Sequence, residues 1–433
     1  MGLLFTAGLL IYYLFFLKRR GASRSPLSLL LWQVYFALGV AAAIIGLTGA
    51  LQPVYAPNYL SVLFLLLCVC ISIAGFLSFR AQDAAALFGR IGGQRILENV
   101  LIGSQFLAIL FFLPFAMSSL TGDVNENRLQ LTERMEALGS FGLINTVAGA
   151  ATQLFSTSLL LAFIRLSSRP GNQRHVLRSA LLFLGSLSYV VYILAYVGRD
   201  GVVYWAMTAA AAYLIFRAHL SAPDRARIVA LGSLVSALLL IPFLTITIAR
   251  FVDTESGLRW SFLEYFGAQI NHFSDYSTID RPTTFGVLNF PMAFDAVCAV
   301  AGIGCESWQD IKELIFALYL AQDKEPWLFG TFVSDFVADF EYAGAIVLVV
   351  LLALAAHWLC AKSRRPDHLT LARLMLIFFL YLVPLWGVFY FRFSIANGFI
   401  VINLMFIGLA ALLNRLAPGH GGRHGATWQG AAR

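Results

Sequence analysis

The chain has 433 residues, of which 59% are hydrophobic and only 12% are charged, and its formal net charge is +7. Soluble proteins carry about 25% charged residues, so this composition excludes an ordinary soluble globular protein and predicts an integral membrane protein. The positive charge could indicate nucleic-acid binding, but its distribution along the chain argues against that role. We expect one all-α transmembrane domain over residues 1–433.

Eleven apolar runs predict about 11 transmembrane helices, since a helix needs about 20 apolar residues to cross about 30 Å of hydrocarbon. The first run is followed at once by Lys18, Arg19 and Arg20, which is typical of a retained segment and not of a cleaved signal peptide. The runs are Leu3–Leu17, Leu27–Ala50, Tyr59–Phe79, Val100–Met117, Phe141–Ile164, Ser179–Val197, Val202–Phe216, Ile228–Ile248, Ala343–Cys360, Leu374–Phe391 and Ser394–Leu413.

The connections between the runs alternate in charge. One alternate set holds 21 of the 30 lysines and arginines, whereas 19 of the 23 acidic residues lie elsewhere. Cytoplasmic connections of membrane proteins are enriched in Lys and Arg. We therefore predict an outer amino terminus and a cytoplasmic carboxyl terminus. The glycine-rich tail 414–433 is expected to be cytoplasmic and disordered.

The longest polar stretch, 249–342, is predicted to be an outer loop between the eighth and ninth crossings. An amphipathic helix is expected over Leu258–Phe273 on the membrane surface, and a second helix over Trp308–Gln322. Cys298 and Cys305 could form a disulfide here, because an oxidising compartment permits one.

Three arginines from different hairpins lie at the predicted outer boundary: Arg199, Arg250 and Arg392. Guanidinium groups match phosphate oxygens well, so three that converge would bind a diphosphate. Each also has a simpler interpretation. Arg199 could pair with Asp200 or a lipid headgroup, Arg250 could anchor a helix end, and Arg392 could reach out to headgroups.

Glycosyl transfer requires a base for the acceptor hydroxyl and cations for the departing diphosphate. His272, Glu264 and Asp280 are the main candidate bases, with Asp275 as a further one, and Asp335 and Asp339 could bind the acceptor sugar. For each carboxylate, a solvated surface position is the alternative. The outer loops contain no Asp-x-Asp motif, so we expect a metal-independent reaction and no cofactor.

This organisation resembles the Wzy-type polymerases of O-antigen and related oligosaccharide repeat units. The resemblance rests on the number of crossings, the large late outer loop, the short arginine-bearing hairpin before it, and two segments. These are Phe332–Gly344 (FVSDFVADFEYAG) and Arg24–Leu29 (RSPLSL). The family is similar to O-antigen ligases and to multi-spanning glycosyltransferases with an outward-facing site. The paired arginine–glycine loop motif of some members has no clear match here.

The resemblance implies an enzyme of the bacterial cytoplasmic (inner) membrane. Such enzymes transfer a growing glycan from undecaprenyl diphosphate to the next lipid-linked repeat unit, at the outer face. The expected partners are this lipid-linked oligosaccharide, membrane lipids and a chain-length regulator protein, with no nucleic acid. The implied diphosphate ligands are Arg199, Arg250, Arg281 and Arg392, and the side chains expected to stack on sugars are Trp260, Tyr265, Tyr276 and Trp308.

Two alternatives remain. One is an O-antigen ligase, which uses a lipid A core as acceptor. The other is a non-enzymatic polysaccharide or lipid transporter, a class that often has inverted repeats and broken helices, neither of which is evident in this sequence.

Overall fold

The computed structural model is helical and contains no strand among the residues it describes, so the predicted all-α fold is confirmed. The described residues are 1–19, 25–48, 58–80, 94–121, 138–168, 173–251, 267–276, 279, 281–302, 308–322, 330–363, 369–392 and 397–416. The predicted tail 414–433 lies outside them after residue 416.

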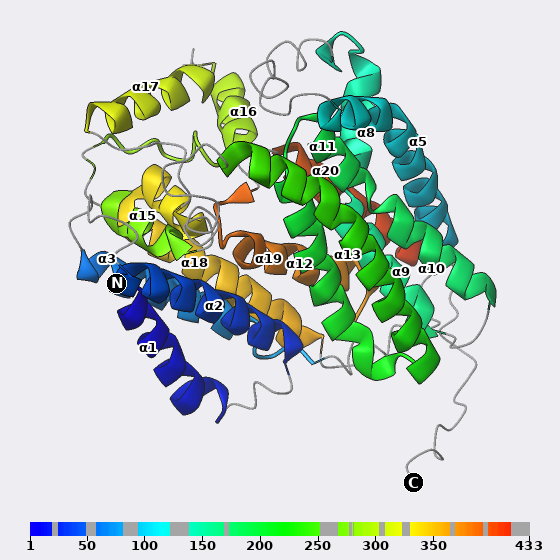
Figure 1. Ribbon diagram of the computed structural model, residues 1–433, viewed down its shortest axis with the longest axis horizontal. Helices are drawn as coiled ribbons and strands as arrows, with labels where there is room; N and C mark the ends of the chain where they lie inside the picture. The colour runs from blue at the N-terminus through cyan, green and yellow to red at the C-terminus, as the bar shows by residue number, and fades with distance from the viewer. Residues whose placement is uncertain are drawn as a thin grey trace.

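The helices pack as a bundle, and a smaller group of helices lies at one end of it (Figure 1). In chain order they are α1 (Gly2–Tyr12), the π-helix η1 (Tyr13–Leu17), α2 (Pro26–Thr48), α3 (Tyr59–Gly75), α5 (Gln94–Leu120), α8 (Leu143–Thr152), α9 (Phe155–Ser168), α10 (Gln173–Gly185), α11 (Ser188–Ala195), α12 (Asp200–Phe216), the 3-10 helix η3 (Arg217–His219), α13 (Ala222–Phe251), α15 (Gln269–Tyr276), α16 (Pro291–Ala301), α17 (Trp308–Ala321), α18 (Thr331–Lys362), α19 (Leu371–Trp386) and α20 (Asn397–Leu416).

In the described part of the chain, seven spans are long and apolar enough to cross a membrane, and α8 with α9, bent by 43° at their junction, would make an eighth. Each of the eleven predicted runs falls on a helix or a pair of consecutive helices. Three of these, α1 with η1, α3 and α19, are shorter than a usual span. A helical polytopic protein is therefore supported, while the number of eleven crossings stays a prediction.

The helix ends form two groups, as the alternation of charge predicts. At the end predicted to be cytoplasmic, the Ser25 hydroxyl donates to the Phe76 carbonyl at 2.8 Å, and Arg165 pairs with Glu98 at 3.3 Å. At the opposite end, the Ser119 hydroxyl donates to the Ala195 carbonyl at 3.2 Å. Connections assigned to the same side by sequence thus contact each other in the fold.

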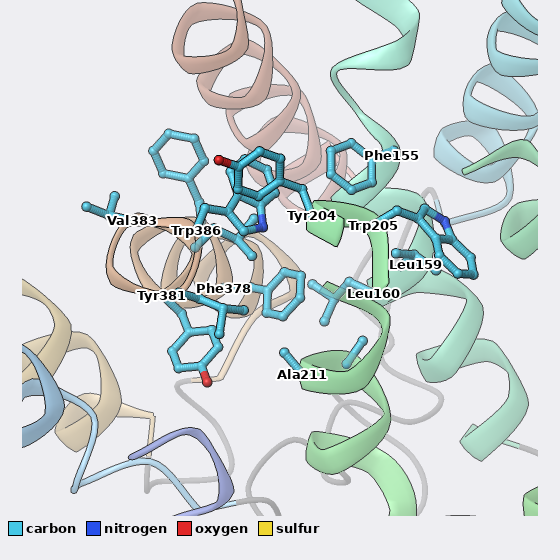
Figure 2. Packing of buried hydrophobic residues seen from close by; sticks show 14 of the residues in the cluster. Phe155, Leu159, Leu160, Tyr204, Trp205, Ala211, Phe378, Tyr381, Val383 and Trp386 are labelled. Atoms are coloured by element: carbon cyan, nitrogen blue, oxygen red, sulfur yellow. The ribbon is translucent and has the colours of Figure 1, made fainter. Parts of the chain in front are cut away.

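The core is centred on α19, which lies between α18 and α12 in Figure 1. A helix that is apolar all round belongs inside a protein, and most of α19 is buried. Figure 2 shows two of its side chains, Trp386 and Phe378, facing side chains of α9 and α12. The Trp386 indole nitrogen donates to the Thr208 hydroxyl at 3.0 Å, and the Trp386 ring stacks on Phe155 with centroids 5.6 Å apart.

The first helix of the outer loop differs from its prediction. Residues 258–266 lie outside the described part, and the remainder forms α15, which packs on α2, α3 and α18. Its side chains Ile270 and Phe273 are fully buried. The expectation of a helix lying on the membrane surface is therefore wrong for α15, because both of its faces contact other helices.

Two further helices complete this loop, and both lie at the upper left of Figure 1. The predicted helix over Trp308–Gln322 is confirmed as α17, whereas α16 is an addition to the predicted elements. Within α16, Cys298 is disulfide-bonded. Its expected partner Cys305 lies outside the described residues.

Candidate functional site

Arg392 follows the central helix and is held by a dense set of contacts. Its Nη1 atom lies 3.3 Å from the Asp200 carboxylate and donates to the Tyr390 hydroxyl at 2.5 Å. Its Nε atom donates to the Tyr189 hydroxyl at 3.2 Å, and its guanidinium lies 5.5 Å from the Tyr204 ring centroid. The side chain is only 12% exposed. The carboxylate that a buried arginine needs is therefore Asp200.

The hairpin that carries Asp200 also places Arg199. The chain turns between α11 and α12 because Gly198 and Gly201 pack tightly on Ile193, where a Cβ at Gly198 would lie 2.6 Å from a methyl carbon. Arg199 is 5% exposed, and its Nη1 atom donates to the Thr247 hydroxyl of α13 at 2.9 Å. Arg199 is therefore buried at this hairpin, and its neighbour Asp200 is the residue that pairs with Arg392.

Arg250 lies three residues beyond Thr247 in α13, at the same end of the bundle. Its side chain lies outside the described residues. Convergence of this third guanidinium therefore stays a prediction.

The segment 387–392 is fixed in place by the first turn of α18. The Thr331 amide donates to the Phe389 carbonyl and the Phe332 amide to the Gly387 carbonyl, both at 2.8 Å. The Phe391 amide in turn donates to the Asp335 carboxylate. Asp335 therefore lies beside the residue that precedes Arg392.

Arg281 reaches the same region from the outer loop. Its Nη1 atom donates to the Tyr319 hydroxyl of α17, and its guanidinium lies 5.5 Å from that ring. Burial raises the pKa of the Tyr319 phenol, an effect that the charge of Arg281 opposes and the charge of Asp335 strengthens. Both charges are thus close enough to act on Tyr319. These contacts bring Arg281 close to Asp335, which binds the Phe391 amide beside Arg392, whereas the Arg199 guanidinium contacts Thr247 of α13.

Asp339 occupies a different kind of environment from Asp335. Its carboxylate accepts hydrogen bonds from the Thr284 hydroxyl, the Leu288 amide, and the amide and side chain of Asn289. The side chain is fully buried. Asp339 therefore holds the 284–289 turn against α18, and this geometry does not favour its predicted contact with a sugar.

The remaining predicted residues divide between α15 and the undescribed part of the loop. His272 is 4% exposed and stacks on Tyr276 at 6.3 Å, and Tyr276 packs edge-on against Tyr319 at 5.1 Å. Ring contacts therefore link His272 to Arg281. The Trp308 indole nitrogen donates to the Leu288 carbonyl at 3.4 Å. Other predicted residues lie outside the described part of the chain: Glu264, Asp280, Trp260 and Tyr265.

Backbone strain is concentrated at this end of the molecule. Among the described residues, four that are not glycine have positive φ: Val197 at 55°, Phe285 at 50°, Thr331 at 76° and Glu341 at 57°. Such values are real outliers for β-branched residues such as Val197 and Thr331. Strained positions of this kind cluster at binding and catalytic sites. All four adjoin the contacts described above, which marks this end as the candidate site.

Several residues of the site were not predicted: Asp200 as the partner of Arg392, and Tyr189, Tyr204, Tyr319 and Tyr390 as its aromatic lining. A tyrosine inside an apolar run has no sequence signal that separates it from core packing. The doublet Arg199–Asp200 was a usable signal, since a carboxylate beside a boundary arginine must also find a partner.

That the arginines line one common pocket also stays a prediction. Two cavities among the described residues lie elsewhere, one between α9, α10 and α13 and the other between α3, α18 and α19. Comparison with known proteins adds no further guide, because no protein-family model, no curated protein and no solved structure matches the chain.

Proposed function

We propose that the protein polymerises oligosaccharide repeat units carried on undecaprenyl diphosphate, at the outer face of a bacterial cytoplasmic membrane. In this reaction a hydroxyl of the acceptor unit attacks the anomeric carbon of the donor glycan. The bond from that carbon to the diphosphate breaks, undecaprenyl diphosphate leaves, and the acceptor proton passes to a base. The proposal builds on the resemblance to Wzy-type polymerases.

The proposal is supported by the ion pair of Asp200, the neighbour of Arg199, with Arg392, and by the closeness of Arg281 to Asp335 at the same end of the bundle. Asp200 pairs with Arg392, and the charge of Arg281 acts on Asp335. The contacts of Arg392 use Nε and Nη1, so its Nη2 donors can still bind a phosphate oxygen. A cationic site with fixed donors can stabilise charge on a departing diphosphate.

The acceptor side of the reaction would use groups that adjoin the arginines. Asp335 has its carboxylate beside Phe391 and within electrostatic reach of Tyr319, so we assign it a contact with an acceptor hydroxyl. His272 stays a candidate base, two ring contacts away from Arg281. Tyr276 packs on His272 and Tyr319 and could pack on a sugar ring.

The disulfide-bonded state of Cys298 supports the sidedness that this proposal needs. Disulfides persist in oxidising compartments and are rare in the cytoplasm. The loop that contains α16 would therefore lie outside, together with the arginine cluster.

The test is complementation of a strain from which the gene has been deleted, with surface glycan resolved by electrophoresis. Arg199→Gln and Arg392→Gln should each reduce polymer at least 100-fold at normal protein level, as loss of a charge-stabilising donor commonly costs 10²–10³ in rate. Lys312→Gln is the matched control, because Lys312 is another outer cation but packs on Trp308 and Phe316 of its own helix. It should retain polymer.

The glycan that a deletion strain makes distinguishes a polymerase from a ligase. A polymerase deletion leaves lipid A core capped with one repeat unit, whereas a ligase deletion leaves uncapped core. Normal polymer in the Arg199→Gln/Arg392→Gln double variant would refute a catalytic role for the arginines and favour a transporter.

A further inference from the structure

A cavity of about 80 Å³ lies between α9, α10 and α13, at the opposite end of α13 from Thr247, the partner of Arg199. Its walls are mainly apolar, with Phe163, Leu166, Phe183, Ile228 and Leu231 among them. The one serine in its wall, Ser179, already donates its hydroxyl to the Ala162 carbonyl at 2.8 Å. A cavity of this character takes apolar ligands and not water.

One end of the cavity is charged. Asp224 and Arg227 contribute to its lining, and they pair at 3.4 Å. The Asp224 carboxylate is buried and also accepts a hydrogen bond from the Ser221 hydroxyl at 2.6 Å. Asp224 is therefore a fixed support that holds the Nη1 side of Arg227. The Arg227 side chain is 64% exposed, so its other donors face outward from the cavity mouth.

Further arginines lie on the helices that line the cavity, close in sequence to its lining residues. Arg165 and Arg178 lie on the neighbouring helices and share the single carboxylate of Glu98, at 3.3 and 3.2 Å. Arg225 adds a further exposed guanidinium beside Arg227. The arginines of α9, α10 and α13 named here outnumber the two carboxylates by four to two. This is the end of the bundle predicted to face the cytoplasm.

We propose that this cavity binds one anionic glycerophospholipid of the inner leaflet. A few methylene groups of one acyl chain would enter the apolar cavity between α10 and α13, and the headgroup phosphate would bind Arg227. A basic mouth between transmembrane helices on the cytoplasmic side is the arrangement that recognises anionic headgroups. The apolar walls suit a hydrocarbon chain and offer no free hydrogen-bonding group that a sugar or a nucleotide would require.

The lipid would have a structural effect on α13. This helix exposes large apolar side chains along its length, among them Val229, Leu234 and Leu238. Its other end holds Thr247, the partner of Arg199. An acyl chain in the cavity would fill the space between α13 and the rest of the bundle, and so would fasten the inner end of the helix. This proposal does not depend on the enzymatic activity proposed above.

The experiment is native mass spectrometry of the full-length protein, purified and delipidated in detergent and then mixed with phosphatidylglycerol or phosphatidylcholine. The wild type should retain one phosphatidylglycerol in preference to phosphatidylcholine. Arg227→Gln should lower that preference about fivefold, the contribution of one basic residue near an anionic lipid, whereas Arg227→Lys should keep most of it. Ala180→Phe, which fills the cavity, should abolish retention of either lipid.

Arg415→Gln is the matched control, because Arg415 is an exposed basic residue in the last turn of α20, on the side predicted to be cytoplasmic. It should bind lipid as the wild type does. Equal retention of the two lipids by the wild type would overturn the proposal, as would an equal loss in Arg415→Gln and Arg227→Gln. Should Ala180→Phe fail to fold, the comparison of Arg227→Gln with Arg227→Lys still decides the question.

Discussion

The ion pair between Asp200 and Arg392 is the interaction on which the candidate site most depends, and its strength can be measured. At 3.3 Å and an effective dielectric constant of about 20, the attraction between the two charges is about 5 kcal/mol. Much of this is offset by desolvation, since the two side chains are 25% and 12% exposed. The phenols of Tyr189 and Tyr390 would still contact Arg392 without Asp200. We therefore expect Asp200→Asn to lower the free energy of unfolding by about 1–3 kcal/mol.

A double-mutant cycle isolates the pair. Asp200→Asn, Arg392→Gln and the double variant would be unfolded in mixed micelles of increasing SDS content and followed by tryptophan fluorescence, for which Trp205 and Trp386 are buried reporters. We expect a coupling energy of about 1–2 kcal/mol, within the usual range for residues in contact. Glu313→Gln, at an exposed outer carboxylate, should change stability by less than about 0.5 kcal/mol. A coupling energy below about 0.3 kcal/mol would refute the pair.

Three further predictions follow from the same end of the molecule. Gly387→Ala should destabilise the protein by about 1–3 kcal/mol, because its Cβ would lie 2.6 Å from the Val383 carbonyl oxygen, whereas Gly408→Ala, with open space around it, should be neutral or stabilising in the same unfolding assay. The raised pKa of Tyr319 means that its phenol stays neutral in the folded state where the unfolded chain ionises, so stability is lost as the pH rises above the usual value of about 10. Unfolding at pH 9 and 11 should therefore show a larger loss in the wild type than in Tyr319→Phe, and an equal loss would contradict the burial of that phenol. Alkylation of denatured protein before and after reduction, read by peptide mass spectrometry, should modify Cys298 only after reduction and Cys360 without it; modification of Cys298 without reduction would remove the support for an oxidising side.

Much of the fold could be predicted because the helices are encoded locally. Each apolar run in the sequence lies on a helix, and the basic connections mark which helix ends lie together, as the pairing of Glu98 with Arg165 and Arg178 illustrates. The burial of α15 could not be predicted in this way. The segment is polar enough for a surface position, and only its contacts with α2, α3 and α18 place it inside.

The candidate site also has a part that could be predicted from the sequence and a part that could not. Its boundary arginines could be found from position alone, since Arg199 and Arg392 each follow an apolar run after almost no loop. The side chains that contact these arginines could not be predicted from the sequence. Asp339 and Asp335 share one helix four residues apart and were indistinguishable by sequence, yet one is enclosed by donors of the 284–289 turn and the other accepts from the Phe391 amide beside Arg392.

Composition and the periodic spacing of charge were sufficient to predict a helical polytopic membrane protein, because the bilayer imposes the same length and charge rules on every crossing. The meeting of the Arg199 hairpin, the segment after α19, the start of α18 and the Arg281 loop was decided by tertiary packing alone. Tyr390 and Asp200, for example, are 190 positions apart and join through a hydrogen bond of 3.3 Å. No local pattern encodes such a contact, since it forms only when buried helices position both groups and each polar side chain must then find a partner.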